Sequence, residues 1–209
     1  MIIPGMSLRY PIPAARHRAE IVVRRSRFVA SAAPTASVAE ARAFIDAIRA
    51  ELPDAGHHVY AFAIGHGSSV IHGMSDDGEP AGTAGRPTLA VVAGSGLGDL
   101  CLVTSRYFGG VKLGTGGLVK AYTEAAQALL EGLPRGIHET TEQVAIHLSY
   151  AQYDTVKRLC EAHAAEIEDE AFGAAVTLRA RLAVDRIAAL AADLAEASAG
   201  SVDLRRIER

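Results

Sequence analysis

The sequence predicts an α+β protein made of two unequal domains. Its 209 residues exceed the usual size of a single domain. The second part of the chain alternates strand-like and helix-like hydrophobic periodicity in the order βαββαβ. Between the two parts, residues 134–136 read Pro-Arg-Gly, a composition typical of a break between domains. We therefore expect a first domain at 1–136 and a second at 137–209.

Composition places the chain among ordinary globular proteins. Hydrophobic residues make up 49% and charged residues 22%, which is enough apolar material for a core. No apolar run approaches the roughly 20 residues of a membrane-spanning helix, and the start lacks a secretory signal, so we expect a cytoplasmic protein with no membrane partner. Cys101 and Cys160 lack the spacing of zinc or redox motifs and are expected to be small buried hydrophobes.

Charge is unevenly distributed along the chain. The net charge of −3 argues against a strongly basic nucleic-acid binder. Residues 1–136 nevertheless carry 13 basic and 11 acidic side chains, whereas 137–209 carry 8 and 13. The first thirty residues contain several arginines that would form a basic patch if they shared a surface, or a solvated strand edge if they did not. These are Arg9, Arg16, Arg18, Arg24, Arg25 and Arg27.

The first domain begins with a leader interrupted by proline. Residues 20–33 alternate as one strand. A helix follows, with Ser37 and Glu40 at capping-box spacing and Pro53 as its stop. Residues 59–64 read as a strand, with 70–72 as its hairpin partner.

The rest of the first domain contains two helices and a buried strand. Residues 87–93 predict a short helix, and the continuous apolar run 100–104 predicts a buried strand. An amphipathic helix begins at Gly116 and ends at Gly132.

The second domain has the element order of a ferredoxin-like fold. Asp185 is a suitable N-cap for its second helix and Gly200 a suitable terminator. The expected strands and helices, in chain order, are strand 144–148, helix 153–163, a strand near 167, strand 176–182, helix 187–194 and strand 202–207.

An acidic loop, residues 75–85, is the first candidate functional segment. Asp76, Asp77 and Glu79 lie within four positions and are followed by Thr83. They could bind Mg²⁺ through water or face a basic partner, although Asp-Gly and Glu-Pro are also strong turn signals of an exposed loop. A carboxylate could alternatively orient Arg106 through a bidentate pair, which would join this loop to the next segment.

A glycine-rich loop, residues 106–117, is the second candidate. It leads from the buried strand into a helix N-terminus, where free N–H groups favour an anion, here with Arg106, Lys112 and Lys120 nearby. The P-loop pattern fails because Thr115 stands where lysine is required, and the dinucleotide fingerprint is absent. Tight packing of turns is the alternative explanation for the glycines.

Metal and cofactor sites are not predicted. The histidines near the central strand, His57, His58, His66 and His72, lack a compact ligand pattern and are expected to be hydrogen-bonded or on the surface. No Gly-x-Ser-x-Gly elbow follows a strand, so a Ser-His-Asp hydrolase is not expected either.

Several motifs together resemble the IMPACT family, in its bacterial YigZ branch. The matching segments are Ser26-Arg27-Phe28, Pro53-Asp54-Ala55 with His57, Tyr60-Ala61, the run Ser75 to Pro80 with Gly82 to Gly85, Arg106 to Gly110, Lys112 to Gly114, and Gly116 to Leu118. The departures are mild: Ser105 stands where threonine is usual, Ala81 where serine is common, and His58-Val59 where asparagine-cysteine is usual.

The resemblance implies the fold more firmly than the activity. It implies a first domain similar to the ribosomal-protein and elongation-factor domain IV type, with two helices on one face of a sheet, and a ferredoxin-like second domain. Eukaryotic relatives regulate translation in a stress-responsive initiation-factor kinase pathway, using an additional N-terminal domain. For the bacterial branch it implies a nucleic-acid or ribosome connection and no established reaction.

The leading hypothesis is a non-catalytic, translation-associated regulator that binds RNA or the ribosome, without DNA sequence specificity. RNA phosphate would contact Arg106, Lys112, Lys120 and the basic leader, while Tyr107 or Phe108 stacks on bases, unless these rings only cap the core. An enzyme that binds phosphate or nucleotide at Gly109–Gly117, with Mg²⁺ at Asp76–Glu79, is the alternative. A protein-interaction module using the acidic second domain is a third possibility. The candidate ligand- or RNA-binding residues are Asp76, Asp77, Glu79, Thr83, Arg106, Tyr107, Phe108, Gly109, Gly110, Lys112, Gly114, Gly116, Gly117 and Lys120.

Overall fold

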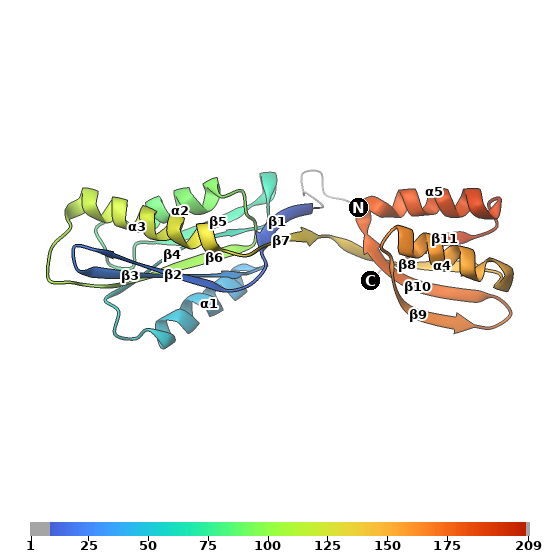
Figure 1. Cartoon of the computed structure of the whole chain (residues 1–209), viewed down its shortest axis with the longest axis horizontal. Coiled ribbons are helices and arrows are strands. Elements are labelled where there is room, and N and C mark those ends of the chain that lie inside the picture. The colour runs from blue at the N-terminus through green and yellow to red at the C-terminus, as the bar shows by residue number, and fades with distance from the viewer. Residues whose placement is uncertain (1–8, 208–209) are drawn as a thin grey trace. The chain divides into compact units, whose positions relative to one another are not determined.

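The computed structural model describes residues 9–207 (Figure 1). These residues divide into two compact units between His138 and Glu139. Each unit has hydrophobic core clusters of its own, as independently folding domains do.

The first unit is built on a five-stranded sheet of order β2-β3-β6-β4-β5, in which every neighbouring pair is antiparallel. Its strands are β2 (His17–Val23), β3 (Ser26–Pro34), β4 (His57–Ile64), β5 (Ile71–Ser75) and β6 (Leu100–Tyr107). The central strand β6 is buried from Leu100 to Arg106. Its continuous apolar run reflects burial on both faces of the sheet.

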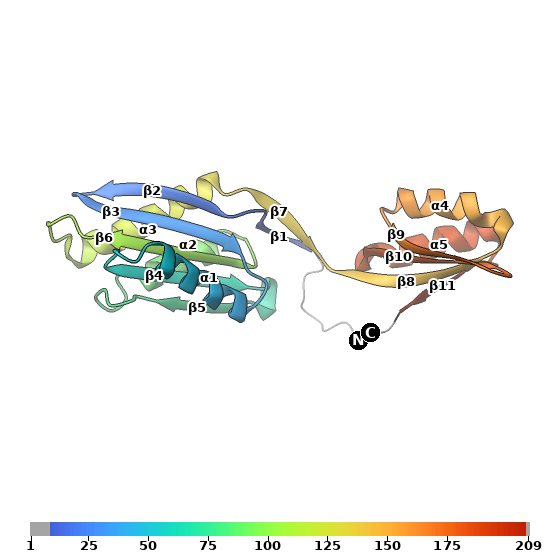
Figure 2. The ribbon, with the colours of Figure 1, turned by 90° about the horizontal axis from the view of Figure 1, so that it is seen from below.

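Helices cover both faces of this sheet. In Figures 1 and 2, α2 (Gly85–Gly94) and α3 (Gly114–Gly132) lie on one face, as the resemblance implied, and α1 (Val38–Glu51) lies on the opposite face. The side of α1 that carries Phe44 and Ile48 packs with Val103, and the side of α3 that carries Tyr122 packs with Phe28. The sheet is therefore the middle layer of three.

Residues 20–33 form a hairpin, so the prediction of one strand there was wrong. Strands β2 and β3 pair from His17↔Ala32 to Val23↔Ser26, and Arg24 and Arg25 make the turn with φ of 45° and 70°. A two-residue turn with both φ values positive is the type that matches the twist of a hairpin, and it usually contains Asn or Gly. Arg24 and Arg25 are not residues typical of such a turn, so the turn was not predicted.

Helix ends follow their predicted signals with small shifts. The Ser37 hydroxyl accepts a hydrogen bond from the Glu40 N–H at 3.2 Å, which confirms the predicted cap of α1. Helices α2 and α3 each begin two residues before the predicted Pro87 and Gly116. For α2 the reason is a cap supplied from outside the helix, described below.

A two-stranded ribbon joins the start of the described chain to the end of the first unit. It pairs β1 (Arg9–Pro13) with β7 (Arg135–Glu139), and the Ala14 N–H donates to the Pro134 carbonyl at 2.8 Å. Residues 134–136 therefore lie where β7 begins. Tyr10 stacks on the His138 ring at 4.6 Å between centroids and donates to Asp99 Oδ2 at 2.8 Å.

The second unit has the predicted ferredoxin-like architecture. Its elements are β8 (Thr141–Leu148), α4 (Tyr153–Ala162), β9 (Glu166–Phe172), β10 (Val176–Ala183), α5 (Ile187–Ser198) and β11 (Asp203–Arg206). The sheet order is β11-β8-β10-β9, with every pair antiparallel. Gly200 ends α5 with φ of 79° and an N–H bond to the Ala195 carbonyl at 2.9 Å. Asp185 lies in a 3₁₀ turn (Val184–Arg186) before α5 and does not cap it.

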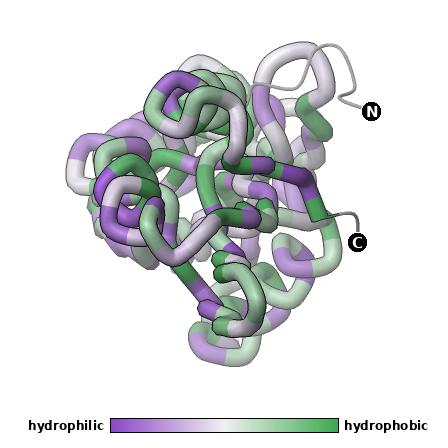
Figure 3. Tube along the Cα trace, turned by 90° about the vertical axis from the view of Figure 1, so that its right-hand side faces the viewer, coloured by the Kyte–Doolittle hydropathy of each residue, from purple (hydrophilic) through white to green (hydrophobic). Residues whose placement is uncertain are grey.

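Short apolar and polar stretches alternate along the trace (Figure 3), and within residues 9–207 no helix is long and apolar enough to cross a membrane. Both cysteines are fully buried, as predicted. Burial raises the pKa of Cys101 to about 12 and that of Cys160 to about 11, so both thiols stay protonated at neutral pH.

Candidate functional site

The acidic and glycine-rich loops meet at one end of the first unit's sheet. Register places His57 opposite Arg106, Ser75 opposite Tyr60, and Tyr107 opposite Arg27. The end of β5, the end of β6 and the hairpin turn of β2–β3 therefore lie at this same end. Loops that are far apart in sequence are brought together by antiparallel pairing alone.

Asp76 caps helix α2 from the loop that follows β5. Its Oδ1 accepts from the N–H groups of Gly85 at 2.7 Å and Ala84 at 3.0 Å, and its Oδ2 accepts from Gly82 at 2.8 Å. Burial alone would raise the pKa of this carboxyl, but the three N–H donors and nearby Arg86 outweigh it and leave the pKa below its usual value. The Asp76 carboxylate thus occupies the anion-binding position at the α2 N-terminus.

Replacing Asp76 with asparagine should destabilise the protein by about 1–3 kcal/mol at pH 7. The substitution removes the negative charge that the three backbone N–H groups face, and it can turn an NH₂ group toward these donors. The folded-state pKa is depressed, so the carboxylate's contribution is present above the unfolded-state pKa of about 3.9 and is lost as the pH falls through the lower folded value. Urea unfolding of both proteins at pH 7 and near pH 3 tests this. The exposed Asp54→Asn should change little, and an equal Asp76→Asn deficit at both pH values would contradict the assignment.

Asp77 ties the loop to α1 and β4. Its Oδ1 accepts from Arg49 Nη2 at 2.7 Å, and its Oδ2 accepts from the His58 N–H at 2.6 Å. Its own carbonyl lies 2.8 Å from His57 Nδ1, and its φ is 46°. A carboxylate held on both oxygens positions the chain and is not open to a ligand.

Glu79 is the centre of a buried polar network. Its Oε1 accepts from Arg106 Nη1 at 2.6 Å and from the Tyr122 hydroxyl at 2.7 Å, and His57 Nε2 lies 4.0 Å away. The carboxylate side chain is 3% exposed. Burial, and then the bond to Glu79, raises the pKa of Tyr122. The acidic loop thus supplies a carboxylate partner for Arg106, through one Nη1–Oε1 contact and not through the bidentate pair that was predicted.

Arg106 lies between two aromatic rings. Its guanidinium carbon is 5.6 Å from the Phe28 centroid and 5.8 Å from that of Phe108. The residue is 6% exposed, and its buried Nε has no hydrogen-bond partner among the described residues. The prediction that Arg106 contacts phosphate is not supported, because reaching solvent would break the pair with Glu79.

The acidic loop is not arranged for magnesium. Asp76, Asp77 and Glu79 each face different protein donors, and Thr83 donates its hydroxyl to the Pro80 carbonyl at 2.6 Å. Across residues 9–207 no group of three His, Cys, Asp or Glu is placed to hold a metal ion. The geometry therefore does not support the alternative prediction of Mg²⁺ in this loop.

Gly109 packs directly on the hairpin turn. A Cβ at this position would lie 2.1 Å from the Arg25 carbonyl carbon, and the Gly109 N–H donates to Ser26 Oγ at 3.2 Å. Gly110 and Gly114 adopt φ of 83° and 71°, values that side chains disfavour. The glycines thus let the loop press against the β2–β3 turn.

The N-terminus of α3 has no side-chain cap and no acidic residue in its first turn. Gly116 and Gly117 belong to this turn, and a Cβ on Gly116 would meet nothing within 4 Å. Lys112 is exposed just before it, and exposed Lys120 lies 3.7 Å from Glu124 one turn later. Unlike α2, α3 therefore presents free N–H groups to solvent.

An exposed basic and aromatic surface surrounds this helix end. Arg24, Arg25, Phe108 and Lys112 are exposed, with Phe108 60% accessible. Tyr107 is half-buried, with the Arg27 guanidinium 4.3 Å from its ring centroid. We call the exposed residues Arg24, Arg25, Arg27, Phe108 and Lys112, together with the first turn of α3, the tip surface.

The N-terminal arginines do not form one patch. Arg18 bonds Ser31 Oγ at 2.9 Å and Glu51 at 2.5 Å, and Arg16 lies over Phe44 of α1. Only the arginines of the hairpin turn and the start of β3 join the tip surface. Sequence reasoning did not assign Tyr122 to the network, because its helical spacing indicated only a core position.

Comparisons with known proteins agree with these features. The Impact N-terminal domain model matches residues 24–130, and a domain of unknown function, DUF1949, matches 146–201. The Escherichia coli K12 protein "IMPACT family member YigZ" is 40% identical over 94% of this chain and 97% of its own length. "Protein IMPACT-A" of Xenopus tropicalis is 33% identical over 49% of this chain and 33% of its own.

A solved structure extends the similarity to both units. The crystal structure of a hypothetical protein is 38% identical, covers 98% of this chain and 100% of that chain, and superimposes with a TM-score of 0.68. One family accounts for the acidic-loop and glycine-rich motifs, for the two-unit fold and for the relatives that match over nearly their full length. The chain belongs to the IMPACT family, in its bacterial YigZ branch.

Proposed function

We propose that the protein is a non-catalytic, translation-associated regulator that binds RNA or the ribosome through the tip surface. The observation that carries this proposal is the convergence of exposed cations, an exposed aromatic ring and an uncapped helix N-terminus at one end of the first unit. The family resemblance, whose eukaryotic members regulate translation, gives the proposal its biological setting.

The tip surface fits the chemistry of a single-stranded phosphate backbone. Arg24, Arg25 and Lys112 offer charges to phosphates, and the free N–H groups of α3 add a dipolar anion site. Phe108 offers a face on which any base can stack. Arg106 contributes indirectly, because its guanidinium lies over the Phe108 ring and supports it.

Enzymatic chemistry has less support from the geometry. The carboxylates that would hold Mg²⁺ accept hydrogen bonds from protein donors instead, so they serve the fold. Binding of a partner protein from the translation machinery is compatible with the same surface, and we place it second to RNA because Phe108 lies among cations.

Co-sedimentation with ribosomes across a salt series tests the proposal. The wild type should pellet at low ionic strength and dissociate as salt rises. A variant with Arg24→Asn, Arg25→Asn and Lys112→Gln removes three charges, and asparagine tolerates the positive φ of the turn. It should lower the slope of log K against log salt by about 2, given about 0.7 per phosphate contact on a single strand.

The matched control removes three exposed arginines elsewhere, in Arg42→Gln, Arg158→Gln and Arg179→Gln. It should bind as the wild type does. Equal weakening by both triple variants would mean that charge alone, and not the tip surface, drives binding. Absence of wild-type binding at every salt concentration would overturn the proposal.

A further inference from the structure

Strand β5 forms an edge of the five-stranded sheet, and within residues 9–207 β4 is the only strand that pairs with it (Figure 2). The register runs without a shift from Ile64↔Ile71 to Tyr60↔Ser75. In an antiparallel edge strand, alternate residues direct their N–H and C=O groups away from the sheet. β5 therefore presents a regular row of backbone donors and acceptors to which a further strand could bind.

The β5 edge lacks the features that usually protect an edge strand, namely charged side chains, proline and bulges. Its five residues read Ile-His-Gly-Met-Ser, and residues 55–75 contain no Lys, Arg, Asp or Glu. The opposite edge, β2, carries Arg18 and Glu20, and both edge strands of the second unit carry at least three charged residues. Both strands of the β1–β7 ribbon also carry charges. Among the sheet edges that the structure describes, only β5 is uncharged.

The side chains of β5 leave an apolar surface on both faces of the sheet. Ile71 is 54% accessible and Met74 is 42% accessible, and strand geometry places them on opposite faces. Gly73 lies between them, and a Cβ at this position would be 2.1 Å from Cζ of Phe62. The Phe62 ring therefore fills the space above the glycine, at the centre of the strand.

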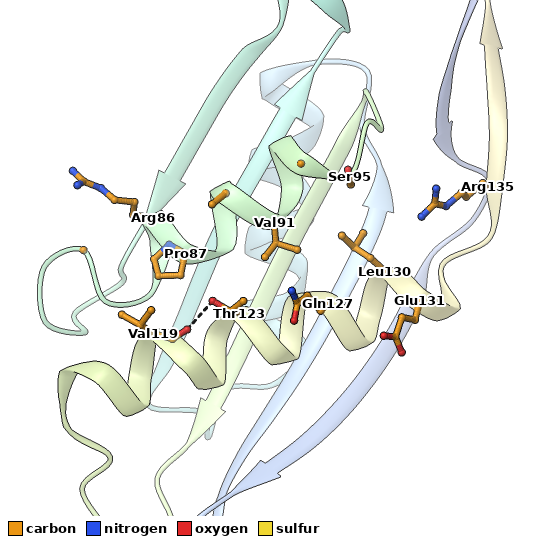
Figure 4. Close-up of a pocket in the computed structure, with 13 residues that line it drawn as sticks. Arg86, Pro87, Val91, Ser95, Val119, Thr123, Gln127, Leu130, Glu131 and Arg135 are labelled. Carbon is orange, nitrogen blue, oxygen red and sulfur yellow. Dashed lines mark hydrogen bonds between the residues drawn. The ribbon is translucent and has the colours of Figure 1, made fainter.

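The hollow between α2 and α3, about 970 Å³ in volume, is a second surface of the first unit that a large partner could cover (Figure 4). Thr123 and Gln127 interrupt its apolar lining between Val119 and Leu130. Along the hollow, the helical backbone groups bond within their own helices. Unlike the β5 edge, it therefore offers neither a continuous apolar strip nor free backbone groups.

We propose that two copies of the chain associate through antiparallel pairing of their β5 strands, with the two-fold axis at Gly73. Gly73 then faces the same residue of the second copy. On either side of it, Ile71 faces Ser75 and His72 faces Met74. The two five-stranded sheets become one continuous sheet. β5 contributes no residue to the tip surface, so this association does not depend on RNA binding.

The register centred on Gly73 suits two identical strands. The two Phe62 rings approach each other above the paired glycines, where an aromatic contact stabilises the strand pair. Like charges that face each other destabilise a strand pair, and an uncharged strand avoids this when it meets its own copy. A foreign strand would find no charge complementarity that could select it. The association also stops at two copies, because the pairing is isologous and the β2 edge of each chain is charged.

Sedimentation velocity of the full chain between about 1 and about 500 µM tests the proposal, since one pair of short strands gives a small interface and a concentration-dependent dimer. The wild type should pass from monomer to dimer in this range and form nothing larger. Met74→Lys should raise the dissociation constant at least about tenfold, because it places a charge on each side of the two-fold axis. Val22→Lys, on the opposite edge strand and 65% accessible, is the matched control and should associate as the wild type does.

Disulfide formation tests the register, because Cys101 and Cys160 are both buried and leave an introduced thiol as the reactive one. A mixture of the His72→Cys and Met74→Cys proteins should crosslink about tenfold faster under mild oxidation than either variant alone, because facing residues bring their Cβ atoms closest. A mixture of the His72→Cys and Val22→Cys proteins should show no such increase.

Three results would overturn the proposal. A wild type that stays monomeric at the highest concentration would leave the edge for a strand of another protein. Equal weakening by Met74→Lys and Val22→Lys would place the interface elsewhere. His72→Cys that crosslinks with itself as fast as with Met74→Cys would contradict the register centred on Gly73. Circular dichroism checks that each variant is folded.

Discussion

Glu79→Ala should destabilise the first unit by about 3–5 kcal/mol, the largest effect that we expect from one polar substitution. The change leaves Arg106 charged and buried without its carboxylate and also removes the acceptor of the Tyr122 hydroxyl. Breaking a buried pair by removing one partner costs this much because the remaining charge is uncompensated. Urea unfolding followed by circular dichroism measures the loss.

Glu124→Ala is the matched control. Its carboxylate pairs with Lys120 at 3.7 Å on the surface, where such a pair contributes about 0–1 kcal/mol. A Glu79→Leu, Arg106→Met double variant should recover part of the loss, since replacing a whole buried pair by apolar residues is often tolerated. A Glu79→Ala cost similar to that of Glu124→Ala would show that the network is weakly coupled to folding.

Gly109→Ala should cost about 1–3 kcal/mol, because the new methyl group would overlap the Arg25 carbonyl carbon, which lies 2.1 Å from the Cβ position. The atoms that the methyl group would overlap belong to the backbone, so the glycine-rich loop must separate from the hairpin turn to remove the overlap. Thermal unfolding measures the cost, and changes in the amide shifts of Arg25 and Ser26 report the separation.

The same substitution at Gly116 provides the control with the opposite sign. A Cβ there meets nothing within 4 Å, and Gly116 lies in the first turn of α3, so alanine should stabilise the helix by about 0.5 kcal/mol. If Gly109→Ala and Gly116→Ala gave the same change, close packing on the hairpin turn would not be the reason for glycine at 109.

The sequence predicted most of the fold because periodicity and capping signals are local. The α1 cap at Ser37 and the βαββαβ order of the second unit both rest on neighbouring residues, and both are confirmed. The hairpin at Arg24–Arg25 was missed because its turn uses residues without turn preference. The prediction of a single strand at 20–33 therefore failed only at the turn. The hydrophobic pattern on either side of the turn did indicate strand.

The candidate site was less predictable because its geometry depends on contacts between distant residues. The composition of residues 75–85 marked a functional or structural loop, but nothing local showed that Asp76 caps α2 while Glu79 enters the core. Arg106 was expected to contact phosphate or, alternatively, to pair with a carboxylate of the acidic loop, and it is buried and bonded to Glu79. Phe108 and Lys112 are exposed as an RNA contact would require.

The β1–β7 ribbon has a consequence for the order of events during synthesis. Its two strands come from opposite ends of the first unit, so β1 has no strand to pair with until residues 135–139 have left the ribosome exit tunnel. Long-range pairing is slow to form because a long loop must close first. We therefore expect the five-stranded sheet to assemble as translation proceeds and the ribbon to fasten it last, just as the second unit begins to emerge.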